Sequence, residues 1–464
     1  MPSWDRRSAA AHRKARAAAL RAQVVDAVAP SSPWWRERLA TQGRTAEQVA
    51  TPEGVAGLPA VGERDVCPDG DPAGAAALVL QTGEDGYALH AEGPRLRRAL
   101  ARRLTRPGAY AQVVEQDTRP TTFVWAGLSL QWPVASTRGD LDVVARAGAR
   151  AWSVLGLGRG DVLVTALPAR PSATSQALEL AALGAGAPAL AAGERADDVA
   201  EALWLLPATV LAAPADALAV LLDDLVDLGA PLGALRTALL LGWPSEAERE
   251  AVRDALERGG LEGVDVLGLH VPDGHRLPWA QCRASAGGPP QLHAHPDLEL
   301  LQVVAPDSGE TTDGAGELVL TQLGLRGSAL LRWRTGDAVD GLEEGPCPSC
   351  GRTTWRPAGL RRAALVPVLA LRGGLTPVDL RGVSGALAGR ADVADWRVQV
   401  AQDRAGRDQL LVHVVPGPGA DEGDVVVGVA RDVRAAAGLL PTQVVVHAPG
   451  GLPGETGARL LVPA

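Results

Sequence analysis

Strand-like and helix-like segments alternate along the middle of the chain, and this pattern constrains the fold more than any other feature. Short apolar runs such as DVLVTALP (161–168) and LRTALLLG (235–242) are separated by segments with helical periodicity, such as SEAEREAVRDALERGG (245–260). Strands that alternate with helices of about ten to fifteen residues are typical of βαβ units around a mostly parallel sheet. The pattern therefore predicts an α/β domain.

The segments that flank this region follow other patterns. Residues 7–50 carry alanine, leucine and arginine at helical spacing, and the Ser-Ser-Pro sequence that begins at Ser31 is a helix start signal. After residue 296 the pattern becomes all-β, and from about residue 372 a hairpin, a helix and a last strand predict a compact α+β unit. We therefore expect a large N-terminal domain (1–360), a hinge (361–372) and a small C-terminal domain (373–464).

Composition excludes several classes of protein. The net charge of −9 leaves no overall basic field that would hold nucleic acid or an anionic membrane. Four cysteines in 464 residues do not indicate a secreted disulfide scaffold. No run of about eighteen apolar residues is present, so we expect no membrane span. These features favour a cytoplasmic protein that binds neither nucleic acid nor membrane.

Lysine is almost missing from the chain. The only lysine is Lys14, close to the N-terminus. Any mechanism that needs a lysine ammonium elsewhere in the chain is therefore excluded.

Five segments, spread over nearly the whole chain, carry a resemblance to a known family. They are SSPWWRERLATQGRTAEQVATPEGVAGLPAVGERD (31–65), TRGDLDVVARAGARAWSVLGLGRGDVL (137–163), GELVLTQLGLRGSALLRWRTGDAV (316–339), PCPSCGRT (346–353) and GGLPGETGARLLV (450–462). In this order they resemble the adenylate-forming (acyl-CoA synthetase, AMP-binding) superfamily, and within it the phenylacetate–CoA ligase-like branch. The resemblance implies an adenylate-forming enzyme fold of the α/β class, with a large N-terminal α/β domain, a β-rich subdomain at about 296–360 and a small α+β C-terminal domain.

In that family ATP and a carboxylic acid form an acyl-adenylate, which coenzyme A then attacks. Three parts of the family's phosphate machinery are replaced here. The loop expected to be rich in Ser, Thr and Gly reads WAGLSLQWP (125–133), Val271 stands where an acidic residue helps to hold Mg²⁺, and Ala458 stands where a lysine stabilises charge at the α-phosphate. Asp273 is a weak substitute for the acid. Loss of a single electrostatic stabiliser typically costs about 10²–10³ in rate, so the resemblance predicts that ordinary adenylation is lost.

The nucleoside part of the family's site is better preserved. By resemblance, Asp337 of RTGD would accept both ribose hydroxyls, and Arg361 is a candidate nucleotide-binding arginine. An alternative is that Asp337 only caps a turn. We interpret His270 and His275 as loop residues. Bound AMP, ATP or coenzyme A is expected only if activity is retained.

The turn PCPSCG contains Cys347 and Cys350, and two thiolates at this spacing form half of a zinc site. Cys282 and His293 are candidates for the other half, and by resemblance a cysteine and a histidine occupy similar places in some members of the branch. His295 competes with His293 as the fourth ligand. The prediction is a closed, structural Zn²⁺ site that braces the fold; the alternative is a group of free buried thiols.

Two hypotheses for function follow. In the first, the chain keeps the fold, has lost adenylation and acts as a non-catalytic binding or partner protein, whose ligand is an acyl or aryl small molecule. In the second, it is a divergent acyl- or aryl-CoA ligase, or an acyl transferase, that still uses a nucleotide or coenzyme A. The sequence leaves both a protein partner and a homodimer open.

Overall fold

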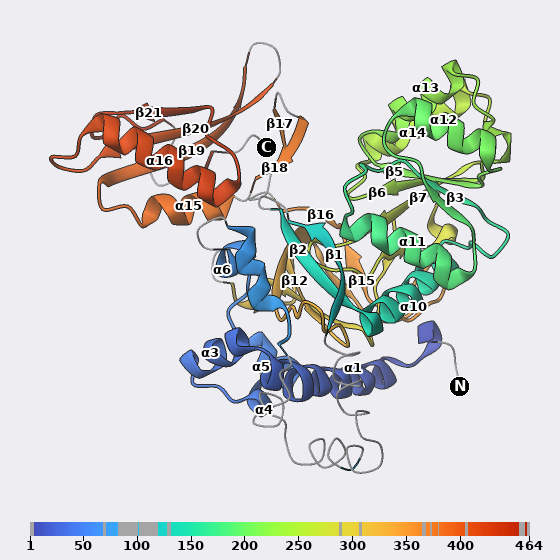
Figure 1. Cartoon of the computed structure of the whole chain (residues 1–464), viewed down its shortest axis with the longest axis horizontal. Coiled ribbons are helices and arrows are strands. Elements are labelled where there is room, and N and C mark those ends of the chain that lie inside the picture. Colours follow the sequence, from blue (N-terminus) through green and yellow to red (C-terminus); the bar gives the residue numbers. More distant parts are fainter. Residues whose placement is uncertain are drawn as a thin grey trace.

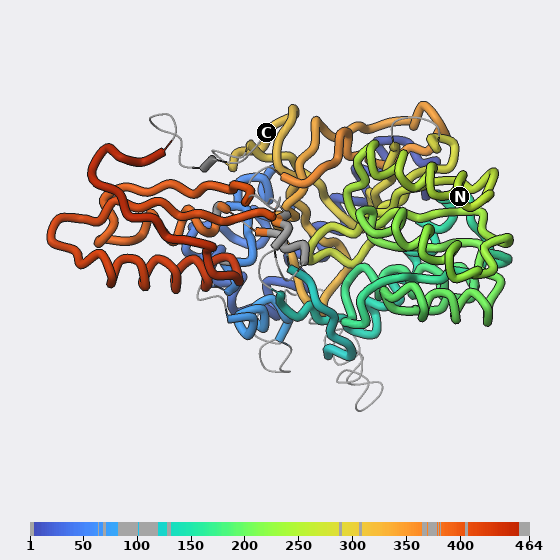
Figure 2. The backbone as a smooth tube through the Cα atoms, turned by 90° about the horizontal axis from the view of Figure 1, so that it is seen from above, coloured from blue at the N-terminus to red at the C-terminus, as the bar shows by residue number. Residues whose placement is uncertain are grey.

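The structure is a computed structural model. It describes residues 4–67, 71–81, 101, 119–127, 131–286, 290–305, 309–363, 368–371, 374–378, 380–403, 407–453 and 460–461. The elements form an N-terminal helical layer, an α/β layer, a β-rich region and a C-terminal α+β unit. Figures 1 and 2 show the C-terminal unit at one end of the molecule and the α/β layer at the other. In the described part of the chain, no helix combines the length and the apolar character needed to cross a bilayer.

The N-terminal layer consists of helices that begin at side-chain caps. Ser8 caps α1, and Ser32 accepts a hydrogen bond from the Trp35 amide with Pro33 in the first turn of α3, as the Ser-Ser-Pro signal predicts. The elements are η1 (Trp4–Arg6), α1 (Ala9–Gln23), a π-helical turn η2 (Val24–Val28), α2 (Ala29–Ser31), α3 (Pro33–Thr41), α4 (Ala46–Val49), α5 (Pro52–Ala56), α6 (Glu63–Val66) and η3 (Pro72–Leu78).

The predicted α/β domain is confirmed as a seven-stranded sheet with the order β4-β3-β5-β6-β7-β8-β9. Its first five strands are parallel, and the last two are antiparallel to their neighbours. The strands are β3 (Leu163–Thr165), β4 (Ala189–Ala191), β5 (Val210–Pro214), β6 (Thr237–Leu241), β7 (Asp265–His270), β8 (Trp279–Gln281) and β9 (Leu292–His293).

Helices cover both faces of this sheet. One apolar cluster joins the sheet to α12, α13 and α14, and a second joins it to α10 and α11, as Figure 1 shows. Capping boxes at Thr137, Ser172 and Ser245 begin three of these helices. The helices are α10 (Arg138–Val154), α11 (Ala173–Ala185), α12 (Ala196–Leu205), α13 (Leu218–Asp227) and α14 (Glu246–Arg258).

The region after residue 296 is antiparallel β structure, as predicted. A five-stranded sheet has the order β11-β10-β12-β13-β16, and a short hairpin, β14–β15, carries the PCPSCG turn. The largest apolar cluster lies between this sheet and the N-terminal helices. The strands are β10 (Glu299–Val304), β11 (Thr311–Thr312), β12 (Gly316–Gln322), β13 (Trp333–Val339), β14 (Gly341–Glu343), β15 (Arg356–Ala358) and β16 (Arg361–Arg362).

The segment that stands where the family has its phosphate loop begins and ends in two paired strands. β1 (Pro120–Ala126) pairs antiparallel with β2 (Trp132–Thr137). Residues 128–130, between them, lie outside the described residues, and so does Ala458.

The C-terminal unit has the predicted hairpin, helix and final strand, and its own apolar cluster. Its four-stranded sheet has the order β21-β20-β19-β22. The elements are the hairpin β17 (Val368–Leu371) and β18 (Gly374–Pro377), then α15 (Leu380–Ala388), β19 (Val393–Gln402), β20 (Asp408–Pro416), α16 (Glu422–Ala437), β21 (Gln443–Val446) and β22 (Leu460–Leu461).

Candidate functional site

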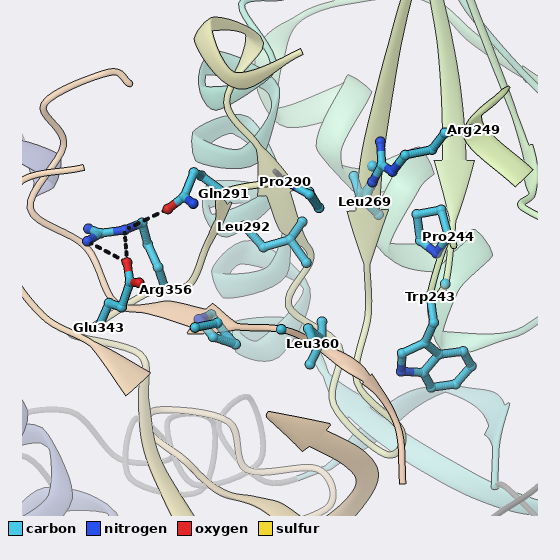
Figure 3. Close-up of a pocket in the computed structure, with 15 residues that line it drawn as sticks. Trp243, Pro244, Arg249, Leu269, Pro290, Gln291, Leu292, Glu343, Arg356 and Leu360 are labelled. Carbon is cyan, nitrogen blue, oxygen red and sulfur yellow. Dashed lines mark hydrogen bonds and ion pairs between the residues drawn. The ribbon is translucent and has the colours of Figure 1, made fainter. Parts of the chain in front are cut away.

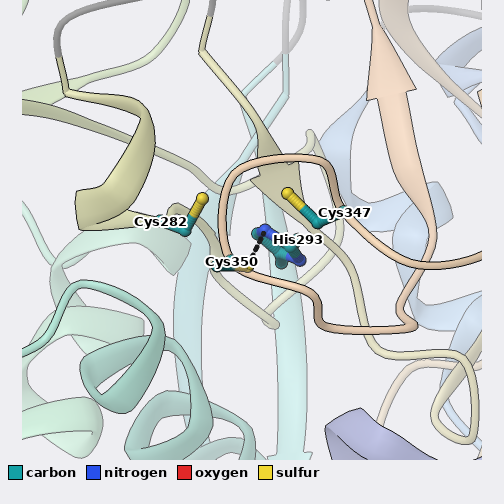
Figure 4. Close-up of side chains that lie close together, drawn as sticks. All are labelled: Cys282, His293, Cys347 and Cys350. Atoms are coloured by element: carbon teal, nitrogen blue, oxygen red, sulfur yellow. Dashed lines mark hydrogen bonds between the residues drawn. The ribbon is translucent and has the colours of Figure 1, made fainter.

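The structure brings the four predicted metal ligands together. The Sγ atoms of Cys282, Cys347 and Cys350 and a ring nitrogen of His293 all lie within 4.8 Å of one another. Cys282 follows β8, His293 is in β9, and the other two cysteines come from the turn between β14 and β15 (Figure 4). Two segments about 60 residues apart in sequence therefore converge on one point.

Hydrogen bonds orient the histidine of this group. His293 Nδ1 lies 2.6 Å from Thr354 Oγ1, and His293 Nε2 lies 3.5 Å from Cys350 Sγ. When Nδ1 donates its proton to Thr354, Nε2 presents a lone pair to the three sulfurs, as a metal-ligating imidazole does. The competing candidate, His295, is not in the group, because its Nε2 donates to the Pro278 carbonyl at 2.9 Å.

Burial and neighbours shift the ionisation of the group in different directions. Burial raises the pKa of the Cys282 thiol to about 12. Burial, together with the charges of Arg352 and Arg356, lowers the pKa of His293 to about 3. Burial also opposes ionisation of Cys350, but hydrogen bonds from Arg352 outweigh it and lower the pKa of that thiol. The histidine is thus neutral, and Arg352 is the cation that stabilises an ionised Cys350.

The N-terminus fastens the turn that carries two of the cysteines. The Thr353 amide donates to the Asp5 carbonyl at 2.8 Å, and Arg352 Nε donates to the Asp5 carboxylate at 2.9 Å. Arg6 donates to the carbonyls of Cys350 and Gly351. The turn is therefore held in place by the N-terminal segment of the chain.

Asp337 lies elsewhere, in β13, and is fully buried at 0% exposure. Its Oδ1 accepts a hydrogen bond from Trp243 Nε1 at 2.6 Å, and its Oδ2 lies 3.1 Å from His270 Nε2. The carboxylate therefore does not cap a turn. Both of its oxygens are bonded to side chains from the ends of β6 and β7.

The two candidate nucleotide residues are not brought together. Arg361 is exposed and pairs with Asp340 at 2.7 Å. In the β13–β16 ladder Asp337 lies opposite Arg362 instead. The Arg362 guanidinium stacks on the Trp243 ring at 4.0 Å, and burial lowers its pKa against the attraction of Asp337 and Asp273.

The two histidines that we interpreted as loop residues are both buried. The interpretation is wrong for His270, because it is the last residue of strand β7. His275 does lie between strands, but its Nε2 is 2.7 Å from the buried Glu299 carboxylate. Loop histidines are usually solvated, whereas these two are held by carboxylates that the sequence separates by 67 and 24 residues.

The proposed substitute for the family's acidic residue is also buried. Asp273 Oδ1 accepts a hydrogen bond from the Gly127 amide at 2.6 Å, while its Oδ2 has no hydrogen-bond partner. Burial, with the nearby negative charge of Glu63, raises the pKa of Asp273 well above its usual range. A carboxyl group in this state is a poor cation ligand.

A pocket of about 300 Å³ lies beside Trp243 (Figure 3). The sequence analysis did not identify it, because its walls come from six separate segments and none has a recognisable motif. They are Gly242–Pro244, Arg249, Gly268–Leu269, Pro290–Leu292 and Glu343 together with Arg356–Leu360. Most of the wall is apolar, and Arg249, Glu343, Gln291 and Arg356 supply the polar groups.

No protein-family signature matches the sequence, and no curated protein matches it. Solved structures do match. The 2-hydroxyisobutyryl-CoA ligase in complex with 2-HIB-AMP and CoA in the thioesterification state has a TM-score of 0.64 at 17% identity, covering 99% of this chain and 91% of that one.

Two other structures of the same ligase match similarly. An open conformation has a TM-score of 0.61 at 17% identity, covering 99% of this chain and 93% of that one. The postadenylation state with 2-HIB-AMP has a TM-score of 0.60 at 16% identity, covering 100% and 92%. Over almost its whole length, therefore, this chain has the adenylate-forming enzyme fold.

Proposed function

We propose that the chain is a phenylacetate–CoA ligase-like protein that has lost ATP-dependent adenylation. In this proposal it acts as a binding protein for a small acyl or aryl molecule and is braced by a structural zinc ion. The two parts of the proposal rest on different groups of residues.

The observation that carries the loss of adenylation is the state of Asp337. By the resemblance, its two oxygens would accept the ribose hydroxyls of a nucleotide. Here Trp243 and His270 already occupy both oxygens, and the carboxylate has no exposed surface. A nucleotide would have to displace a half-buried indole and break its hydrogen bond to a charged acceptor, which costs about 1.5–3 kcal/mol.

The phosphate side of the site supports the same conclusion. Phosphates bind to nests of backbone amides and hydroxyls and to cations. Val271 provides none of these groups. The raised pKa of Asp273 disfavours the charge that would hold Mg²⁺. Since the chain's only lysine is Lys14, no lysine replaces the family's C-terminal one.

The zinc brace is supported by the donor set. Three sulfurs and one imidazole nitrogen are the ligands that Zn²⁺ prefers in closed structural sites, where tetrahedral Zn–S distances of about 2.3 Å place the donors about 3.7 Å apart. A group within 4.8 Å needs only a small contraction to reach this geometry. Bound zinc would neutralise thiolates that burial otherwise disfavours, and it would join β8, β9 and the β14–β15 turn.

A second candidate function is a divergent acyl- or aryl-CoA ligase, or an acyl transferase. The observation that favours it is the match over nearly the full length to a ligase in complex with 2-HIB-AMP and CoA. In this case Trp243 would move aside when a nucleotide binds, and Asp337 would then be essential.

ATP–pyrophosphate exchange with a panel of short-chain and aryl acids separates the two candidates. Loss of adenylation predicts exchange at the level of the no-enzyme blank, for the wild type and for Asp337→Ala alike. Exchange that any acid stimulates, and that Asp337→Ala removes, would establish the ligase instead. A thermal-shift screen with AMP and coenzyme A tests nucleotide binding without turnover.

A further inference from the structure

We infer that the pocket beside Trp243 is a binding site for a small monocarboxylate, with the anionic group on Arg249 and the apolar body against the opposite wall. This inference deepens the proposed binding function, on which it rests, by assigning the site and the chemical class of the ligand. It starts from a buried arginine that the fold leaves without a counter-ion.

Arg249 lies in the first turn of α14 and is only 3% exposed. Its Nη1 donates to the neutral amide oxygen of Gln281 at 3.1 Å, and its Nε has no hydrogen-bond partner. Among the residues that the structure describes, no carboxylate lies within ion-pair distance of it. Burial accordingly lowers the pKa of this guanidinium. A buried cation in this position is costly unless an anion joins it.

Two other buried arginines make more hydrogen bonds than Arg249 does, although the Nε atom of each also lacks a partner. Arg276 donates to five acceptors, among them the Asp140 carboxylate. Arg332 donates to three backbone carbonyls and to the Thr311 hydroxyl. The hydrogen bond from Arg249 to Gln281 positions the guanidinium without neutralising it, as a site for an external anion requires.

The position of Arg249 relative to the pocket fits this role. Figure 3 shows its side chain directed toward Leu269, at one end of the pocket, while Leu292 and Leu360 lie between it and the far wall. Gln281 Oε1 also accepts a hydrogen bond from the Gly268 amide at 2.9 Å, and Gln281 Nε2 donates one to the Ser285 carbonyl at 3.0 Å. The amide that holds Arg249 is therefore itself fixed.

The rest of the pocket defines the ligand. Arg356 is already neutralised by Glu343 at 3.0 Å, which leaves Arg249 as the one uncompensated charge on the wall as described. One cation selects a monoanion, and Glu343 repels polyanions such as nucleotide phosphates. A volume of about 300 Å³ with proline and leucine walls suits a short acyl or a single aromatic group.

Isothermal titration with matched acids and amides tests the inference. The probes are benzoate and phenylacetate, with benzamide and phenylacetamide as neutral partners of the same shape. The wild type should bind an acid more tightly than its amide. Arg249→Gln should weaken acid binding about ten- to hundredfold, as expected for loss of a hydrogen-bonded charge pair, and should leave amide binding unchanged. Arg253→Gln is the matched control, since Arg253 is one turn further along α14 and pairs with Glu246 outside the pocket.

A stability measurement distinguishes a ligand-binding arginine from a structural one. Because Arg249 is buried without a counter-ion, Arg249→Met should raise the melting temperature of the ligand-free protein, while Gln281 keeps its bond to the Gly268 amide. A structural arginine would lower it. If Arg249→Gln does not fold, Leu360→Trp fills the pocket from the other wall and should abolish acid binding.

Three outcomes overturn the inference: no acid binds the wild type at millimolar concentration, acid and amide bind equally, or Arg249→Gln binds acid as the wild type does. Acid-stimulated ATP–pyrophosphate exchange would refute only the loss of adenylation. It would leave the dependence of acid binding on Arg249 intact, so the two failures are distinguishable.

Discussion

The indole nitrogen of Trp243 lies 2.6 Å from Oδ1 of Asp337, although 94 residues separate the two in sequence. Trp243 follows β6, and Asp337 is in β13 of the β-rich sheet. The bond therefore joins two subdomains, and the same tryptophan forms one end of the pocket that contains Arg249. Trp243 therefore lies between Asp337 and that pocket.

Removal of this indole should expose the carboxylate. Trp243→Ala should create measurable AMP binding, roughly tenfold or more tighter than in the wild type, because two ribose hydroxyls can then reach Asp337. Isothermal titration with AMP measures the gain. The double variant Trp243→Ala/Asp337→Asn should lose it. Equal AMP affinity in the wild type and in Trp243→Ala would show that Trp243 does not close the site.

The arrangement of the fold could be predicted where the information is local. Alternating apolar and helical segments identify the strands and helices of the central sheet, and the Ser-Ser-Pro signal marks the start of α3. The states of His270 and Asp337 could not be predicted in this way. They depend on which side chain from another subdomain meets a given carboxylate, and no local pattern encodes that contact.

In the candidate site, too, local sequence patterns predict one part and not the other. The spacing of Cys347 and Cys350 indicates half of a metal site by itself, and the resemblance suggests Cys282 and His293 as the rest. The pocket around Arg249 has no such spacing. An arginine in the first turn of a helix is usually solvated, and only packing against β7 and Gln281 buries this one.

Metal content is the direct test of the zinc brace. The purified protein should contain one equivalent of zinc per chain, and Cys350→Ser should lose it, because a closed site needs all four ligands. The melting temperature should then fall by roughly 5–10 °C. Cys67→Ser is the control, since Cys67 is buried outside the group. Elemental analysis that finds no zinc in the wild type would support free buried thiols.

The ion pair between Arg150 and Asp297 should contribute to stability in a pH-dependent way. Two hydrogen bonds, at 2.7 and 2.9 Å, join α10 to the segment before β10. Burial opposes the charge of Asp297, but these bonds and the attraction of Arg150 outweigh it and lower the pKa of the carboxyl. Asp297→Asn should cost about 1–3 kcal/mol at neutral pH.

The sign of the pH dependence follows from the lowered pKa of Asp297. Its contribution is fully present above the unfolded pKa of about 3.9 and is lost as the pH falls through the lower folded value. Urea unfolding of the wild type and Asp297→Asn should therefore converge only in strong acid. Asp223→Asn, which breaks an exposed pair with Arg258, should have almost no effect. A difference that disappears already at pH 5–6 would contradict this assignment.

The C-terminal unit contains a histidine pair that should make it less stable in mild acid. His413 Nδ1 lies 2.9 Å from His447 Nε2, joining β20 to β21, and His413 Nε2 lies 3.0 Å from Gln399 Oε1. Burial, then the neighbouring charges of His447 and Arg397, lower the pKa of His413. The unfolded chain therefore binds a proton more tightly at this residue than the folded chain does.

The stability that neutral His413 allows is fully present above the unfolded pKa of about 6.5 and decreases as the pH falls below that value. The free energy of unfolding falls by about 1.4 kcal/mol for each pH unit by which folding lowers the pKa of His413. Hydrogen exchange of β20 and β21 should thus lose protection between about pH 7.5 and 5.5. His447→Gln removes the like charge but keeps a hydrogen-bond partner, so the loss should become smaller. Strand β5 in the same samples is the internal control, because it has no titrating neighbour of this kind among its pairing strands. An equal loss of protection in the wild type and in His447→Gln would mean that the pair does not cause it.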